Sequence, residues 1–149
     1  MLSLKKQLLE LCHQAVDAKI TACISAIALA RESSREETKS SAGDKYETAR
    51  AMIQQEIDKY SLQLRDAEKQ KSLLTGIPET TDVIIRNGSL VNTNNGIFFI
   101  SISIGPLVIE KETYLAISPV SPIGALLLGK RKGDTFQFRG NEYRVEEVE

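Results

Sequence analysis

The chain has 149 residues, of which 42% are hydrophobic and 26% are charged, and its net charge at pH 7 is -1. This balance is typical of a globular protein and excludes a disordered or fibrous chain. A net charge near zero also argues against a general nucleic-acid binder, because neutralising phosphates normally requires a basic surplus. The longest apolar stretch of the first half, from Ile20 to Ala30, is shorter than the ~20 residues that span a bilayer.

The start of the chain lacks the basic segment and unbroken apolar run of a signal peptide. We therefore expect a cytoplasmic protein with no membrane partner. The single histidine, His13, lies beside Cys12, and this pair has neither the spacing of metal ligands nor a nucleophile with its base. Cys12 and Cys23 fall on one predicted helix at a separation of ~16 Å, which excludes a disulfide between them. An enzyme that works alone is not expected.

Residues 1–76 predict a helical hairpin. Apolar residues recur at steps of three and four from Leu9 to Ala30, and again from Tyr46 to Leu74, which is the period of a helix with one buried face. The polar segment 33–43 separates the two stripes. Because neither stripe can be buried alone, we predict two helices of about thirty residues that pack antiparallel as a coiled coil.

Residues 77–149 predict a small α+β domain, since they hold all four prolines and seven of the nine glycines. Expected strands over 89–93 and 97–102 flank Asn94-Asn95-Gly96, and the Asn-Gly pair predicts a hairpin with a type I′ turn. Further strands are expected over 113–117, 134–138 and 142–148. Between them, Ser121 is predicted to cap a short helix that begins with Pro122 and ends at Gly129.

Three motifs resemble the Gre transcript cleavage factors, which bind bacterial RNA polymerase. The family's C-terminal pattern of I-S, S-P-I, A-L-I-G-K and G-D is similar to Ile117-Ser118, Ser121-Pro122-Ile123, Leu127-Leu128-Gly129-Lys130 and Gly133-Asp134. The family's G-S-x-V resembles Gly88-Ser89-Leu90-Val91, and its G-D-L-S-E-N-A resembles residues 43–49. The chain departs from the family pattern at the tip, where Lys45 replaces Leu and Thr48 replaces Asn, and in the C-terminal motif, where Gly124-Ala125 stands in place of the common Ala-Arg.

The resemblance implies a helical hairpin (1–76) followed by an FKBP-like domain (77–149) that docks on RNA polymerase. The docking residues carried over by position are Ser121, Pro122, Ile123, Gly129 and Lys130. The tip of the hairpin would enter the secondary channel of a DNA-directed transcription complex and reach the 3′ end of backtracked nascent RNA. The factor would then stimulate RNA cleavage by the polymerase without being an enzyme itself.

At the tip, the resemblance implies that Asp44 and Glu47 help to hold a Mg²⁺ ion that is shared with the polymerase active centre. No tightly bound cofactor of the factor alone is expected. The same two residues also fit a capping box, in which Asp44 caps the second helix and Glu47 reaches back. Lys45 and Arg50 are candidates for RNA contact, although the interleaved acidic residues make a solvated helix surface the default interpretation. An alternative function is a secondary-channel regulator or inhibitor that binds polymerase without stimulating cleavage.

Overall fold

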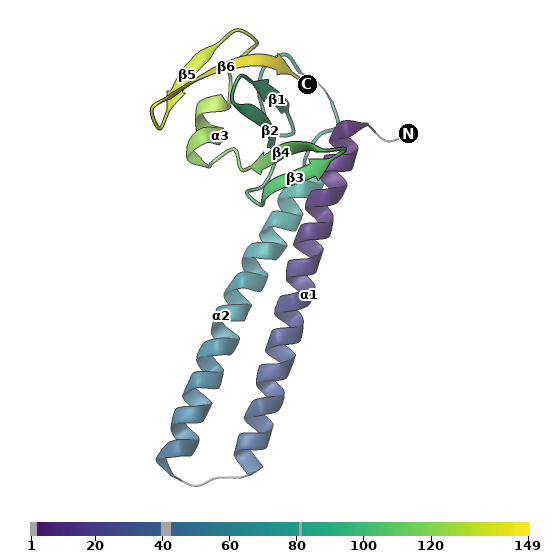
Figure 1. Ribbon diagram of the computed structural model, residues 1–149. Helices are drawn as coiled ribbons and strands as arrows, with labels where there is room; N and C mark the ends of the chain where they lie inside the picture. The colour runs from purple at the N-terminus through teal and green to yellow at the C-terminus, as the bar shows by residue number, and fades with distance from the viewer. Residues whose placement is uncertain (1–2, 40–42, 81) are drawn as a thin grey trace. The chain divides into compact units, whose positions relative to one another are not determined.

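The computed structural model describes residues 3–39, 43–80 and 82–149, and it describes the backbone alone for Glu37, Thr38, Lys39 and Asp44. The predicted loop residues 40–42 therefore lie outside the described residues. The elements in chain order are α1 (Leu4–Lys39), α2 (Asp44–Thr75), β1 (Leu90–Thr93), β2 (Gly96–Ile100), β3 (Gly105–Ile109), β4 (Glu112–Ile117), α3 (Pro122–Leu127), β5 (Thr135–Phe138) and β6 (Asn141–Val148) (Figure 1).

The chain divides into two compact units. The hairpin unit comprises Val16–Lys71, and the sheet unit comprises Met1–Ala15 together with Ser72–Glu149. The first turns of α1 thus belong to the same unit as the sheet. The predicted division into residues 1–76 and 77–149 is a statement about folding domains, and it stays a prediction.

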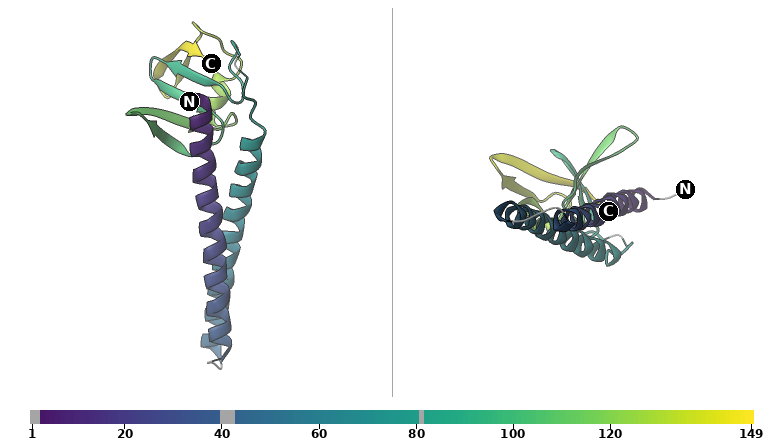
Figure 2. Two further views of the ribbon diagram at one scale, coloured as in Figure 1. Left: turned by 90° about the vertical axis from the view of Figure 1, so that its right-hand side faces the viewer. Right: turned by 90° about the horizontal axis from the view of Figure 1, so that it is seen from below.

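The hairpin unit confirms the predicted helical hairpin, with α1 and α2 side by side and antiparallel in all views (Figures 1 and 2). The apolar stripe of α1 supplies four buried side chains, Val16, Cys23, Ile27 and Ala30. In α2, Ala67 is buried, and the aromatic and branched residues of the stripe are half-buried. Across the seam, Lys71 Nζ lies 2.8 Å from Asp17 Oδ1. The period of three and four therefore identified the face along which the helices pack.

The sheet unit has six strands in the order β3-β4-β2-β1-β6-β5. The pairs β1–β2, β1–β6, β3–β4 and β5–β6 are antiparallel, whereas β2 and β4 are parallel. The α+β class and the order of a hairpin followed by a sheet domain agree with the sequence analysis. The FKBP-like character of the domain stays a prediction of the resemblance.

Two details of the sheet correct the sequence analysis. β3 was not expected, because Pro106 and Gly105 are poor strand residues and the β3–β4 turn has no glycine or asparagine. β3 lies at the edge of the sheet, where a proline is tolerated, and the turn places Glu110 and Lys111 at φ 49° and 70°.

The predicted β1–β2 hairpin is present, but its type I′ turn is wrong. That turn requires positive φ at both central residues, and within the described residues positive φ outside glycine occurs at Glu110, Lys111 and Arg139. Gly96 instead takes φ 121° as the first residue of β2. Thr93 Oγ1 stabilises the observed turn, since it accepts from Asn95 N at 3.0 Å and donates to Gly96 O at 2.8 Å.

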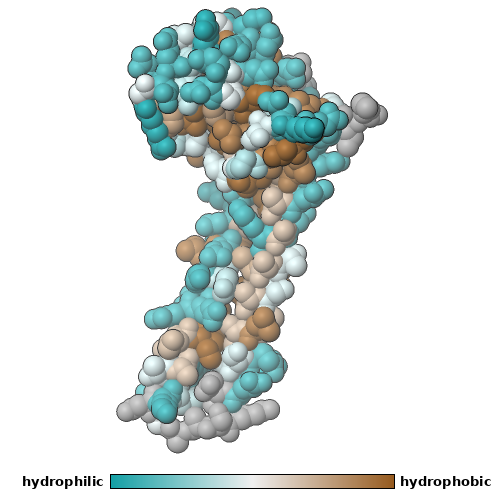
Figure 3. All heavy atoms as spheres, viewed as in Figure 1, coloured by the Kyte–Doolittle hydropathy of each residue, from teal (hydrophilic) through white to brown (hydrophobic). Residues whose placement is uncertain are grey.

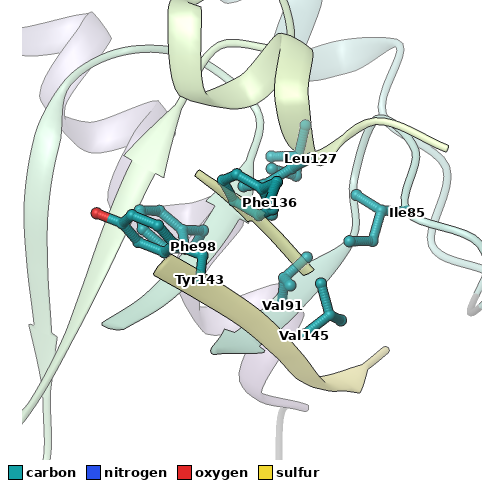
Figure 4. Packing of buried hydrophobic residues seen from close by; sticks show 8 residues of the cluster. Ile85, Val91, Phe98, Leu127, Phe136, Tyr143 and Val145 are labelled. Carbon is teal, nitrogen blue, oxygen red and sulfur yellow. The ribbon is translucent and has the colours of Figure 1, made fainter. Parts of the chain in front are cut away.

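The main core lies between the sheet and α3 (Figure 4). The rings of Phe136 and Tyr143 stack with centroids 5.0 Å apart, and Leu127 of α3 is fully buried in the same cluster. The start of α1 is buried elsewhere in this unit: Leu8 and Cys12 have no exposed surface, and Cys12 Sγ lies 3.9 Å from Ser101 Oγ. Two groups of buried apolar residues therefore stabilise the sheet unit: the core beneath α3, and the residues at the start of α1.

Candidate functional site

The motif around α3 is built on Ser121, which caps the helix as predicted. Ser121 Oγ accepts a hydrogen bond from Gly124 N at 3.1 Å and donates one to Ser118 O at 2.6 Å. Pro122 occupies the first helical position, where its missing N–H costs nothing. Ser121 thus satisfies a free amide of the helix and ties α3 to the end of β4.

The packing around residue 124 shows why this position, where the chain departs from the pattern it resembles, is a glycine. A Cβ on this residue would lie 2.1 Å from Ser118 O and 2.8 Å from Ser121 Oγ, and real Cβ atoms do not approach a carbonyl oxygen so closely. The backbone of α3 therefore packs directly against the segment before it, which is possible because position 124 has no side chain.

The end of α3 joins the helix to the chain before β1. Gly129 has φ 83° and donates its N–H to Ile85 O at 2.8 Å, and Lys130 O accepts from Ile85 N at 2.9 Å. The Lys130 ammonium lies 5.5 Å from the centroid of the Phe136 ring. Ile123 is half-buried against the core. Of the five proposed docking residues, Ser121, Ile123, Gly129 and Lys130 thus have structural roles, and Pro122 is exposed.

An apolar surface beside these residues was missed by the sequence analysis. We call the exposed residues Val120, Pro122, Leu126 and Leu128 the α3 face; Val120 is 88% exposed and Leu128 39%. Figure 3 shows the hydrophobic atoms of this unit gathered around α3, β3 and β4, whereas the surface above them is hydrophilic. The run Leu126-Leu127-Leu128 was the available signal, because a helix of six residues buries one face and leaves the flanking leucines outside.

At the tip, α2 begins one residue earlier than a capping box of Asp44 and Glu47 requires. Gly43 O accepts hydrogen bonds from Tyr46 N at 3.1 Å and Glu47 N at 3.4 Å, so Gly43 holds the cap position and Asp44 is the first helical residue. Asp44 and Glu47 both lie in the first turn of α2. There the positive end of the helix dipole favours carboxylates. The side chain of Asp44 lies outside the described residues.

The basic residues near the tip do not neutralise Glu47 in this structure. Glu47 is exposed, and no ion pair joins it to the side chains that the structure describes. Arg50 Nη1 instead donates to Tyr46 Oη at 3.2 Å, with its guanidinium 6.0 Å from the centroid of that ring. Lys45 is exposed. The first turn of α2 therefore presents one described carboxylate to solvent.

Neither a metal centre nor a membrane helix is found in the described part of the chain. Across residues 3–39, 43–80 and 82–149, no three histidine, cysteine, aspartate or glutamate side chains gather as metal ligands. The helices of those same segments lack the combined length and apolarity of a membrane-spanning helix. A pair of carboxylates at the tip is accordingly part of an ion site at most, because Mg²⁺ prefers six oxygen ligands.

Comparisons with known proteins give structural neighbours but no sequence family. No protein-family model matches the chain, and no curated protein matches it. Among solved structures, the chain is similar to GreA factor homolog 1 (Gfh1) of Thermus thermophilus, with 20% identity over 95% of this chain and 94% of that chain and a TM-score of 0.35.

Two further solved structures give the same result. One is described as the transcription factor Gfh1, with 19% identity, coverage of 94% and 92%, and a TM-score of 0.35. The other is Gfh1 of Thermus aquaticus, with 21% identity, coverage of 89% and 94%, and a TM-score of 0.33. At TM-scores this low, the likenesses carry no argument about what this chain does.

Proposed function

We propose that this chain is a transcription elongation factor of the Gre type that binds RNA polymerase through its sheet unit. One observation carries the proposal: the motif residues that resemble the family, from Ser121 to Asp134, come together around α3 and are joined by hydrogen bonds. The cap at Ser121 and the backbone pairing of Ile85 with Gly129 and Lys130 hold this motif in place. Beside it lies the exposed α3 face, and the exposure of these apolar side chains supports a protein contact there.

The finer proposal assigns the tip a role in catalysis by the polymerase. Asp44 and Glu47 would enter the secondary channel on the hairpin and share a Mg²⁺ ion with the polymerase active centre at the 3′ end of nascent RNA. An ion in that position supplies charge stabilisation for phosphoryl hydrolysis. Two features support the role: the exposed, unneutralised state of Glu47 within the described residues, and the place of both carboxylates in the first turn of α2.

Docking is tested by a charge on the α3 face. Val120→Asp places a carboxylate on a side chain that is 88% exposed, so the fold is expected to tolerate it. Burying that unpaired charge against polymerase should weaken binding by roughly tenfold or more. The matched control is Val108→Asp, which changes a valine that is 62% exposed on the edge strand β3. Equal binding of both variants to core RNA polymerase would remove the α3 face from the docking surface.

Cleavage is tested by removing the charge at the tip while keeping its shape. Asp44→Asn with Glu47→Gln should abolish most stimulated cleavage in stalled transcription complexes, because amides lack the anionic oxygen that helps to hold Mg²⁺. Polymerase binding should persist, since the α3 face is unchanged. Asp66→Asn with Glu68→Gln removes the same charge from exposed positions of α2 and serves as the control.

The same assay separates the alternative function. A wild-type chain that binds polymerase and leaves cleavage unchanged would be a secondary-channel regulator or inhibitor. Stimulation at the wild-type rate by the double amide variant would instead show that another residue carries the chemistry.

A further inference from the structure

The sheet unit contains a pocket that has no part in the proposed function. It has a volume of about 260 Å³, and its apolar lining comes from Leu4 at the start of α1, Leu90 of β1 and Ile97 of β2. Glu112, Glu147 and Glu149 also line it. The pocket thus combines apolar side chains with carboxylates.

Strand register explains how the carboxylates come together. Leu90 pairs with Phe99 in β1–β2, Asn92 pairs with Glu147 in β1–β6, and Leu107 pairs with Tyr114 in β3–β4. Because side chains alternate along a strand, Glu112 lies on the same face of β4 as Tyr114. β4 and β6 therefore supply acidic residues on either side of the β1–β2 hairpin.

Tyr114 is a largely buried polar residue that lines this pocket. The side chain is 8% exposed and lines the pocket, yet its hydroxyl has no hydrogen bond to any residue that the structure describes. Burial raises the pKa of Tyr114, and the nearby carboxylates of Glu112, Glu110 and Glu149 raise it further. The hydroxyl therefore stays protonated at neutral pH and has free lone pairs to accept a hydrogen bond.

The charges around the pocket are compensated only in part. Lys132 Nζ lies 3.0 Å from Glu147 Oε1. Burial lowers the pKa of Lys5, and the charge of Glu149 acts against that shift. Glu112 forms no ion pair with any described residue. A surplus of negative charge thus remains among the residues that line the pocket.

We propose that this pocket binds an arginine or lysine side chain of a protein partner. The methylene stem of such a side chain suits the apolar side chains of Leu4, Leu90 and Ile97, and its cationic end suits Glu112 and the Tyr114 hydroxyl. A bare metal ion fits less well, because the described residues offer no cluster of three ligands. The volume also fits one side chain better than a cofactor, whose pockets usually exceed about 300 Å³.

The test uses a short peptide and its uncharged twin. Titration of the full-length, ¹⁵N-labelled chain with acetyl-Gly-Arg-Gly-amide should shift the amide signals of Asn92, Ile97 and Glu112 saturably, and the shifts should shrink with added salt. The citrulline peptide replaces the guanidinium with a neutral group of the same shape and should give no saturable shift. Shifts confined to other residues, or equal shifts with both peptides, would overturn the proposal.

Variants locate the contact. Glu112→Gln should weaken binding of the arginine peptide about two- to fivefold, and Tyr114→Phe, which keeps the ring in place, should weaken it about twofold or more. Glu142→Gln removes an exposed carboxylate of β6 outside the pocket and should change nothing. Unchanged affinity in both pocket variants would contradict the assignment. Dimerisation of the chain that is lost in Glu112→Gln would assign the pocket to a second copy, against the proposal.

Discussion

At Gly124 the chain has no room for a side chain, although alanine is the better helix former. A Cβ would lie 2.1 Å from Ser118 O, so Gly124→Ala forces α3 away from the end of β4. We expect this substitution to lower the free energy of unfolding by about 1–3 kcal/mol, measured by urea denaturation. Gly76→Ala is the control, because a Cβ there meets its nearest atom at 3.7 Å. Equal stabilities of the two variants would show that α3 shifts at no cost.

Asp82 makes the stability of the sheet unit depend on pH, because its pKa is lowered in the folded chain. Its pKa is lowered, first because its carboxylate accepts a hydrogen bond from Ile84 N at 3.1 Å, and then through the charge of Arg86, whose Nη2 lies 2.7 Å from Oδ2. A lowered pKa in the folded state means that the carboxylate stabilises the fold above its unfolded pKa, near 4. That contribution is lost as the pH falls through the folded pKa.

Asp82→Asn should therefore be less stable than the wild type at neutral pH, and the difference should vanish as the pH drops below about 4. Urea midpoints measured between neutral and acid pH provide the test. A difference that stays constant over that range would mean that the amide loses packing instead of charge.

At the scale of elements, the hairpin helices follow from the period of their apolar residues. The pattern separates apolar residues on the buried face from apolar residues outside it: Ile27, which belongs to the stripe, is 7% exposed, whereas Leu29, which does not, is 71% exposed. Ile27→Ala should cost about 2–4 kcal/mol through the cavity it leaves. Leu29→Ala should change the stability little, since it removes exposed surface. Loss of helical circular dichroism in urea measures both, and equal losses would place the seam elsewhere.

Elements with a clear local signal were predictable, and those fixed by the rest of the sheet were not. Ser121-Pro122 identified the start of α3, and the strands expected over 134–138 and 142–148 correspond to β5 and β6, whose turn places Arg139 and Gly140 at φ 50° and 80°. β3 could not be predicted from its own residues. A proline is acceptable in a strand only at a sheet edge, and whether a strand lies at the edge depends on the rest of the sheet.

The candidate site, like the fold, has parts that the sequence predicts and parts that it does not. The sequence identified the motif around α3. Two of its proposed docking residues, Ser121 and Gly129, also hold the backbone of this motif in place, and their docking role stays a prediction. The exposed α3 face could not be predicted from the sequence, because the position of the sheet decides that Leu127 is buried and that Leu126 and Leu128 are exposed. The pocket at Tyr114 could not be predicted either, because strands that are far apart in the sequence supply its carboxylates.

At the scale of the whole molecule, the compact units do not follow chain order. Residues 1–15 belong to the sheet unit although they begin the first helix. Leu8 and Cys12 of this segment have no exposed surface, and Cys12 contacts Ser101. Burial raises the pKa of the Cys12 thiol, because a thiolate is disfavoured away from water, while the hydrogen bond to Ser101 acts in the opposite direction. Cys12 therefore reports on whether α1 stays packed in the sheet unit.

Leu8→Ala should release this contact. We expect alkylation of Cys12 at mildly alkaline pH, followed by mass spectrometry of the intact chain and its peptides, to be slow in the wild type and at least roughly tenfold faster in Leu8→Ala, since a cavity mutation of about 2–4 kcal/mol raises the population of the open form. Cys23, which is 6% exposed in the hairpin unit, is the internal reference and should keep its rate. If both thiols accelerate together, the chain opens as one cooperative body. If neither does, the start of α1 contributes little to the sheet unit, and the predicted boundary after residue 76 describes the folding domains better than the compact units do.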